Sequence, residues 1–389
     1  MGKVISIGKQ NFASLRENDC FYIDKSELIR EWWESQDDIT LVTRPRRFGK
    51  TLNMSMLNCF FSNQYAEKKQ LFEGLSIWND EKYRGLQGSY PVIFLSFASI
   101  KGSNYHDARD GIIMAINEAY SEHRYLLESK ELTEGERKCF EELDNYAKNP
   151  GAKESVANDT ICNAVKNLAN CLYRYYGKKV IILLDEYDTP MQEAYLYGYW
   201  DQFTSFVRSL FNATFKTNPY LERAMMTGIT RVSKESVFSD LNNLNVITST
   251  SLEYETSFGF TEEEVFTALD NMGMSEQKEI VKSWYDGFVF GNQKDIMNQI
   301  AVVNSLVPMK EEKDEYEDKT KKFYQKVLLD RQFLNYPIVL STHVTWFKTL
   351  FGHEKEDVFA FHQLCNSVIV LDEIQSYKNA LWSEIITDR

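Results

Sequence analysis

The sequence of 389 residues contains no apolar run long enough to cross a membrane. Its longest aliphatic runs, residues 180–184 and 368–371, are far shorter than the roughly 18 residues that a transmembrane helix needs. No charged segment followed by an apolar one, the pattern of a signal peptide, opens the chain. We therefore expect a cytoplasmic protein that has no membrane partner.

Cysteine and histidine are scarce, with 6 and 5 residues. No two cysteines have the Cys-x-x-Cys spacing, and no pair of histidines completes a zinc pattern. The sequence thus indicates neither a disulfide framework nor a zinc knuckle. It predicts free thiols in a reducing compartment.

Basic residues are fewer than acidic ones: the chain has 44 Lys and Arg and 57 Asp and Glu, which gives a formal net charge of −13. A protein that coats nucleic acid needs clustered Lys and Arg, so the charge does not indicate a nucleic-acid partner, although it permits a local basic site. Hydrophobic residues make up 43% of the chain, and 25 Phe, 22 Tyr and 7 Trp demand burial. This composition predicts a folded protein, and the length suggests two or three domains.

A phosphate-binding loop is predicted around residue 50. The β-branched run 39–43 is followed by a short loop, by Gly49-Lys50-Thr51 and by the helix-prone stretch 52–61. This order of strand, loop and helix is the one that a P-loop requires, because the helix N-terminus offers N–H groups and partial positive charge to phosphate. We expect Lys50 to reach the β- and γ-phosphates of ATP and the Thr51 hydroxyl to ligate Mg²⁺.

The loop departs from the pattern Gly-x-x-x-x-Gly-Lys-Ser/Thr at its first position, which is Arg44 followed by Pro45. Proline pushes the preceding residue toward an extended conformation, so the chain is expected to enter this loop differently. The three arginines of the loop would add positive charge for the phosphates. The predicted nucleotide-binding residues of the loop are Arg44, Pro45, Arg46, Arg47, Phe48, Gly49, Lys50 and Thr51.

Paired carboxylates end a second predicted strand, the aliphatic run 180–184. In nucleotide hydrolases the Asp at such a strand end holds Mg²⁺ through its water shell, and the Glu polarises the attacking water. We therefore predict Asp185 as a metal residue and Glu186 as a catalytic residue. An ordinary polar turn would explain either this pair or the phosphate loop alone, but the two in this order favour a nucleotide triphosphate site. Whether Asp188 instead orients the loop before the next helix stays open.

A third polar segment, Thr227-Gly-Ile-Thr-Arg231, ends the predicted strand 223–230. Thr227 is predicted to sense the γ-phosphate. Arg231 is predicted to stabilise transition-state charge, within one subunit or between the subunits of a homo-oligomer. The alternative for Arg231 is a surface ion pair or a turn residue.

The order of elements predicts an α/β fold, a P-loop NTPase core whose parallel sheet has helices on both faces. Its predicted strands are 39–43, 92–97, 180–184, 223–230 and 245–250, with a helix-rich region at 103–178. Thr261 and Glu264 form a capping-box pattern that begins a small helical lid. Eleven of the 13 residues 310–322 are charged with mixed signs, which indicates a solvated helix or linker. The predicted domains are a core at 1–256, a lid at 257–296 and a further segment at 297–389.

Several motifs in residues 1–296 resemble the AAA-ATPase-like family of P-loop proteins. They are Phe21-Tyr-Ile-Asp-Lys25, Thr43-Arg-Pro-Arg-Arg-Phe-Gly-Lys-Thr51, Leu184-Asp-Glu-Tyr-Asp-Thr-Pro190, Thr227-Gly-Ile-Thr-Arg-Val-Ser233, Phe238-Ser-Asp-Leu-Asn-Asn243, Phe258-Gly-Phe-Thr-Glu262 and Trp284-Tyr-Asp-Gly287. The resemblance implies an ATP-binding core of the additional-strand class, and it makes the Arg-Pro-Arg-Arg loop the family's own variant. It also implies a nuclease-like domain of the PD-(D/E)xK class after the core, with roles in mobile elements or defence.

Residues 297–389 do not follow that plan, because no predicted strand there ends in Glu-x-Lys. Instead, a strand-like stretch at 336–343 precedes the aliphatic run 364–371, which ends in Asp372-Glu373-Ile-Gln375. This arrangement resembles the Asp-Glu-x-His/Gln motif in the first RecA-like domain of the type I CRISPR-associated helicase, and it predicts a partial RecA-like α/β segment. The alternative is an ordinary α/β strand without catalysis.

The sequence thus predicts an ATP-binding protein in which Mg²⁺-dependent hydrolysis drives a conformational switch. One alternative is a nucleotide-dependent binding module with little turnover. A second is a part of a CRISPR-associated DNA helicase, which the acidic charge and the single phosphate loop make the least favoured of the three.

Overall fold

A five-stranded parallel sheet is the centre of the protein. The computed structural model describes residues 4, 8–148, 156–229, 237–238, 241–285, 288–290, 293–296, 302–303 and 340–341. The strands are β1 (Ile39–Thr43), β2 (Val92–Ser96), β3 (Val180–Asp185), β4 (Leu221–Gly228) and β5 (Leu244–Ile247), in the order β2-β3-β4-β1-β5. All neighbours are parallel, and β4 is inserted between β1 and β3. The predicted α/β class and parallel sheet are confirmed.

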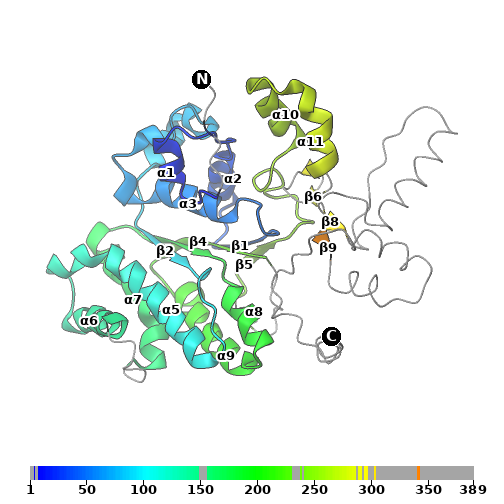
Figure 1. Ribbon diagram of the computed structural model, residues 1–389. Coiled ribbons are helices and arrows are strands. Elements are labelled where there is room, and N and C mark those ends of the chain that lie inside the picture. Colours follow the sequence, from blue (N-terminus) through cyan, green and yellow to red (C-terminus); the bar gives the residue numbers. More distant parts are fainter. Residues whose placement is uncertain are drawn as a thin grey trace, which may run out of the picture. The chain divides into compact units, whose positions relative to one another are not determined.

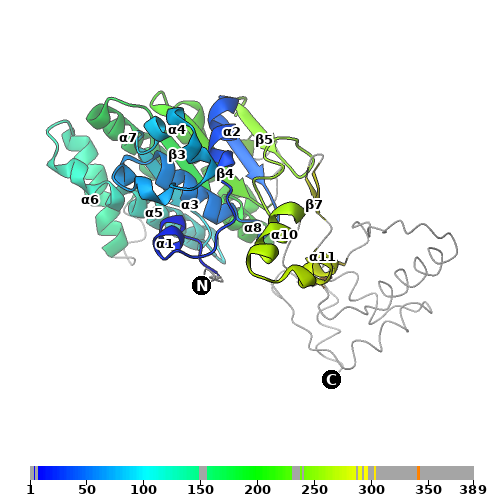
Figure 2. The same ribbon diagram turned by 90° about the horizontal axis from the view of Figure 1, so that it is seen from above.

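Helices cover both faces of this sheet (Figure 1). On one face lie α1 (Phe12–Glu17), α2 (Glu27–Ser35) and α3 (Lys50–Phe61), and α3 contacts β2, β3 and β4. Viewed from above, α3 lies over the strands (Figure 2). On the other face lie α5 (Tyr105–Glu122), α6 (Glu134–Lys148), α7 (Asn158–Tyr176), α8 (Thr189–Leu196) and α9 (Trp200–Phe211). The short α4 (Glu81–Leu86) precedes β2, and the 3₁₀-helix η4 (Arg124–Glu128) follows α5.

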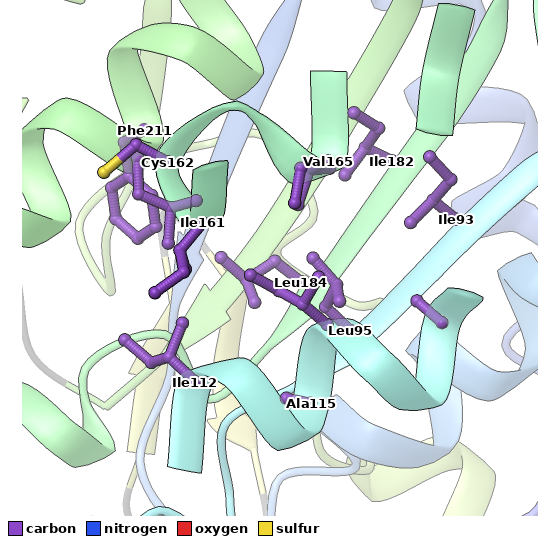
Figure 3. Packing of buried hydrophobic residues seen from close by; sticks show 14 of the residues in the cluster. Ile93, Leu95, Ile112, Ala115, Ile161, Cys162, Val165, Ile182, Leu184 and Phe211 are labelled. Atoms are coloured by element: carbon purple, nitrogen blue, oxygen red, sulfur yellow. The ribbon is translucent and has the colours of Figure 1, made fainter. Parts of the chain in front are cut away.

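The strands are mainly apolar because both faces of the sheet pack against helices. Every residue of β1 and β3 is buried. Alternate residues point to opposite faces of a strand, so Ile93 and Leu95 of β2 join Ile182 and Leu184 of β3 in one core with α5 and α7 (Figure 3). Burying each such side chain contributes about 1.5–3 kcal/mol, which explains why the sheet forms from these runs.

Three strands end earlier than predicted: β2 ends at Ser96 rather than at residue 97, and β4 and β5 also end early. The strand predicted to end at residue 230 ends at Gly228, whose carbonyl accepts the N–H of Arg44, 3.1 Å away. The strand predicted to reach residue 250 ends at Ile247, because a turn follows in which the N–H of Ser251 donates to the carbonyl of Thr248. Polar residues there bond to one another rather than extend the ladder.

A buried histidine that follows α5 is hydrogen-bonded to β2, an edge strand of the sheet. His123 has no exposed surface, and its Nε2 donates to the carbonyl of Val92 at 3.1 Å. Its Nδ1 lies 3.1 Å from the hydroxyl of Tyr125, which donates to it. Burial lowers the pKa of His123 from 6.5 to about 4, against the smaller opposing effect of the Val92 carbonyl. This imidazole is therefore neutral in the folded protein.

Folding stability is expected to fall as the pH drops below 6.5, because an unfolded His123 takes up a proton that the folded one refuses. The stabilising contribution is complete above the unfolded pKa and is lost as the pH falls from 6.5 towards 4. At pH 5.5 the loss is about 1 kcal/mol. Urea denaturation at pH 8 and pH 5.5, in the wild type and in His123→Gln, measures it. Equal pH slopes in the two proteins would contradict the assignment.

A second compact unit comprises Thr261–Phe288 and Lys294–Arg389, and the first comprises Met1–Phe260 and Val289–Gln293. In the second unit, α10 (Glu262–Asn271) begins with the predicted capping box, since Thr261 and Glu264 bond to each other's backbone N–H. The helix α11 (Lys278–Tyr285) is joined to α10 by an ion pair of 2.6 Å between Lys278 and Asp270. The capping box is confirmed, whereas the lid function of these helices stays a prediction.

Four short strands complete the described part of the chain: β6 (Phe288–Phe290), β7 (Gln293–Ile296), β8 (Val302–Val303) and β9 (Leu340–Ser341). β6 pairs with β7, and β8 pairs with β9 in parallel. Asp372 and Glu373 lie outside the described residues, as does most of 297–389, so the RecA-like segment and the predicted domain boundaries stay predictions. Among the described helices, none has the length and apolarity to span a bilayer. The five described cysteines are free and buried.

Candidate nucleotide-binding site

The loop from β1 to α3 has its left-handed residues at positions 47 and 49. The first glycine of the usual P-loop pattern would stand at position 44 instead. Within residues 44–49, positive φ angles occur at Arg47 (68°) and Gly49 (76°). The left-handed conformation is unfavourable for a residue with a side chain, and glycine adopts it freely. Because the chain does not need this conformation at Arg44, an arginine fits there. Arg46 and Arg47 are exposed, Pro45 is half-buried and Phe48 is buried.

The amine of Lys50 is held by the loop itself. It donates to the carbonyls of Arg44 at 2.9 Å and Pro45 at 2.8 Å, and only 6% of the residue is exposed. Burial lowers the pKa of Lys50, and the nearby carboxylates Glu186 and Asp185 oppose this effect. Lys50, the predicted phosphate-binding residue, is thus close enough to Asp185 and Glu186 to interact with them electrostatically. Thr51 is half-buried in the first turn of α3.

Arg44 is fully buried beside two aromatic rings. Its guanidinium carbon lies 4.6 Å from the ring centre of Phe290 and 5.6 Å from that of Phe258. Nη1 donates to the carbonyl of Thr43 at 3.0 Å, whereas Nε and Nη2 have no hydrogen-bond partner among the described residues. Burial lowers the pKa of Arg44 to about 10, and Glu31 opposes this shift. The side chain is therefore stabilised mainly by its cation–π contacts.

Asp185 and Thr227 are joined across the ends of β3 and β4. Both are fully buried, and the Thr227 hydroxyl donates its proton to Oδ1 of Asp185. The same hydroxyl accepts the N–H of Glu186 at 3.3 Å. Oδ2 of Asp185 has no hydrogen-bond partner in the described part of the chain. Thr227 thus orients Asp185 and leaves one carboxylate oxygen available, while its predicted contact with the γ-phosphate stays a prediction.

Glu186 has a strained backbone, with a φ of 52°. A non-glycine residue in this region is destabilised by about 1–3 kcal/mol and requires fixed neighbours. Thr227 supplies them, because its hydroxyl accepts the N–H of Glu186 and its carbonyl accepts the N–H of Tyr187 at 2.9 Å. The Glu186 carboxylate accepts a hydrogen bond of 3.2 Å from the Thr189 hydroxyl. This left-handed backbone conformation sets the direction of the Glu186 side chain immediately after the end of β3.

Asp188 connects the acidic segment to β4. It is fully buried, and its Oδ2 accepts the N–H of Ile229 at 3.0 Å and a side-chain N–H of Gln192 at 2.9 Å. Between the two segments, Gly228 lies so close that an added Cβ would be 2.6 Å from Cε1 of Tyr187 and 2.8 Å from Oδ1 of Asp188. This contact favours the reading in which Asp188 orients the loop.

Gly228→Ala is expected to destabilise the protein by about 2–3 kcal/mol, because the new methyl group overlaps the buried ring of Tyr187 and the buried carboxylate of Asp188. Urea denaturation measures the change. The matched control is Gly85→Ala in α4, where an added Cβ meets nothing within 4 Å. A Gly228→Ala protein as stable as the wild type would show that the neighbouring side chains move aside without loss of stability.

The segment before the second unit covers the phosphate loop, and the sequence reasoning did not assign it to the site. Asn53 of α3 donates to the carbonyl of Ser257 at 2.8 Å, and the N–H of Gly259 donates to the carbonyl of Phe48 at 3.2 Å. Lys25 donates to the carbonyl of Thr256 at 2.8 Å. Lys25 and Gly259 lie in motifs that the sequence analysis quoted, but neither motif matches a phosphate-binding or metal-binding pattern.

Some predicted site features fall outside the described chain or have no direct counterpart. Arg231 lies outside the described residues. Among those that are described, no group of three or more His, Cys, Asp or Glu side chains is placed to hold a metal ion. Lys50, Asp185, Glu186 and Thr227 do come together at the carboxyl ends of β1, β3 and β4. In parallel α/β sheets this edge is where ligands bind.

Residues 6–238, more than half of the chain, match the family described as predicted AAA-ATPase. The chain belongs to this family. Membership in the predicted AAA-ATPase family suggests that the protein binds ATP. The matched range includes the phosphate loop, the Asp185-Glu186 segment and the end of β4.

A curated relative of this AAA-ATPase-like protein is an uncharacterized protein in the vnfD 5′ region of Azotobacter chroococcum mcd 1. The two are 27% identical over 291 residues, which are 74% of this chain and 48% of the relative. The chain thus spans about half the length of the curated relative that it matches. No solved structure matches the chain.

Proposed function

We propose that the protein is an ATPase in which Mg²⁺-dependent hydrolysis at the first unit drives a conformational switch. The observation that carries this proposal is the meeting of Lys50, on the loop after β1, with the carboxylates Asp185 and Glu186 at the end of β3. The electrostatic influence of both carboxylates on the Lys50 pKa reflects their proximity. A cation for phosphate and carboxylates for metal and water are the parts that phosphoryl transfer requires.

Each residue has a role that follows from its position. Lys50, released from the loop carbonyls, binds the terminal phosphates, and the N-terminus of α3 adds its N–H groups. Glu186, turned at its positive φ, orients the attacking water and accepts its proton. Thr227 keeps Asp185 in place through the hydroxyl bond. Arg231, contributed by the same chain or by a second copy in a homo-oligomer, stabilises the charge of the γ-phosphate.

The residues present fit a magnesium ion. The unpartnered Oδ2 of buried Asp185 and the hydroxyl of Thr51 are hard oxygen donors, and Mg²⁺ is typically bound by one or two such groups together with water and phosphate oxygens. When bound, the ion neutralises charge that develops on the transferred phosphoryl group.

The test is to measure phosphate release and ATP affinity side by side on the purified full chain, with Mg²⁺ and with EDTA. Saturable binding with magnesium-dependent release supports the ATPase. The second candidate, a nucleotide-dependent binding module, predicts tight binding without release. It draws support from the Glu186 carboxylate, which is engaged by Thr189 within its own turn. The helicase alternative for 297–389 stays a prediction, and ATP turnover stimulated by DNA would support it.

A further inference from the structure

Two of the three places where the chain passes between the compact units carry an aromatic ring that lies against Arg44. The chain leaves the first unit after Phe260, re-enters it at Val289 and leaves it again after Gln293. Phe258 lies just before the first passage, and Phe290 lies just after the second. Their ring centres are 5.6 Å and 4.6 Å from the Arg44 guanidinium carbon. One residue of the phosphate loop thus contacts rings beside two of the three connections.

This arrangement leaves Arg44 incompletely satisfied. The residue has no exposed surface, and its Nε and Nη2 have no hydrogen-bond partner within the described part of the chain. Buried charged donors without partners are unfavourable, and a cation–π contact offsets only part of that loss. An anion at the loop would supply the missing acceptors.

In this arrangement the amine of the neighbouring Lys50 is not available to bind phosphate. Its amine is bonded to the carbonyls of Arg44 and Pro45, so it must leave them before it reaches a phosphate. When the Lys50 amine moves to the phosphate, the backbone carbonyl of Arg44 loses its hydrogen-bond donor. The positions of the two cations are therefore linked through one stretch of backbone.

We propose that Arg44 is a latch between the nucleotide and the second unit. The terminal phosphates of a bound nucleoside triphosphate draw the Arg44 guanidinium away from Phe258 and Phe290, and this movement frees the two connections that these rings flank. The proposal rests on nucleotide binding at the loop, as set out above, and adds how occupancy is transmitted. Arg44 acts here as a positioning residue.

Because the rings and the phosphates compete for one guanidinium, removing a ring strengthens nucleotide binding. A cation–π contact of this kind corresponds to about a threefold to tenfold change in an equilibrium constant. Phe290→Leu is therefore expected to bind ATP about threefold more tightly than the wild type. Phe258→Leu provides the same test at the other connection.

The experiment is hydrogen exchange on the full chain, with and without a non-hydrolysable ATP analogue and Mg²⁺. The reporter is the amide of Gly259, which donates to the carbonyl of Phe48 at 3.2 Å. We expect the analogue to speed its exchange about tenfold, and Phe258→Leu, which removes the ring beside Gly259, to speed it without nucleotide. Phe140→Leu in α6, a buried ring remote in the sequence from the loop, is the control and should change neither exchange nor affinity.

The outcomes separate the latch from the proposed function. If the wild type binds the analogue but exchange at Gly259 is unchanged, the latch is wrong and the ATP site remains. If both ring variants fold and bind ATP no more tightly than the wild type, the latch is also wrong. If the wild type binds no nucleotide, the proposed function fails, and the latch fails with it. Thermal melts establish that each variant is folded.

Discussion

Lys50→Met is expected to weaken ATP binding about 100-fold. Methionine has a similar length but no charge, so it forms no hydrogen bond to phosphate, and charge-assisted bonds contribute about 1.5–3 kcal/mol each. Isothermal titration with ATP and Mg²⁺ measures the effect. Because Lys50 is buried and bonded to two loop carbonyls, the variant also loses contacts in the free protein. A thermal melt shows whether it is folded.

The control for Lys50→Met is Lys69→Met, which removes an exposed lysine and should leave ATP affinity unchanged. A folded Lys50→Met protein that binds ATP as tightly as the wild type would place the phosphates elsewhere. In that event the match of the loop to the P-loop pattern would reflect the fold alone.

Glu186→Gln is expected to slow phosphate release by about 100-fold to 1,000-fold while leaving ATP affinity within about a factor of three. A positioned general base contributes about this much, and glutamine cannot accept the proton of the attacking water. The amide oxygen of glutamine still accepts the Thr189 hydroxyl, and the backbone contact with Thr227 is unaffected. Steady-state phosphate release beside ATP titration separates turnover from binding.

Glu67→Gln, at an exposed position, serves as the control for this change. If Glu186→Gln hydrolyses ATP at the wild-type rate, Glu186 is not the base. If the wild type itself releases no phosphate, the binding-module function takes precedence and Glu186 is a structural residue of its turn.

The order of elements was readable from the sequence because each strand is a short apolar run bounded by turn residues or charges. The run 39–43 is β1 without change, and 180–184 is extended by Asp185 alone. The capping box at Thr261 was predictable because it depends on contacts three residues apart. Such local patterns need no knowledge of what packs against them.

The surroundings of each loop arginine could not be predicted from the sequence, because they depend on contacts with distant segments. The loop arginines were predicted to supply positive charge to the phosphates, and this stays a prediction. In the structure Arg46 and Arg47 are exposed, while Arg44 is buried against Phe258 and Phe290. A positive side chain in a phosphate loop suggests an anion, and nothing local indicates that two rings from much later in the chain will lie beside it.

The sequence by itself determined the α/β class, the phosphate loop and the paired acids, because these depend on neighbouring residues and on the apolar character of each strand. Only the tertiary structure decided that β4 lies between β1 and β3, so that the Thr227 hydroxyl meets Asp185. It also decided which loop cation is buried and which carboxylate oxygen is left without a partner. Strand order and burial depend on how all the apolar faces pack at once, and no single segment contains that information.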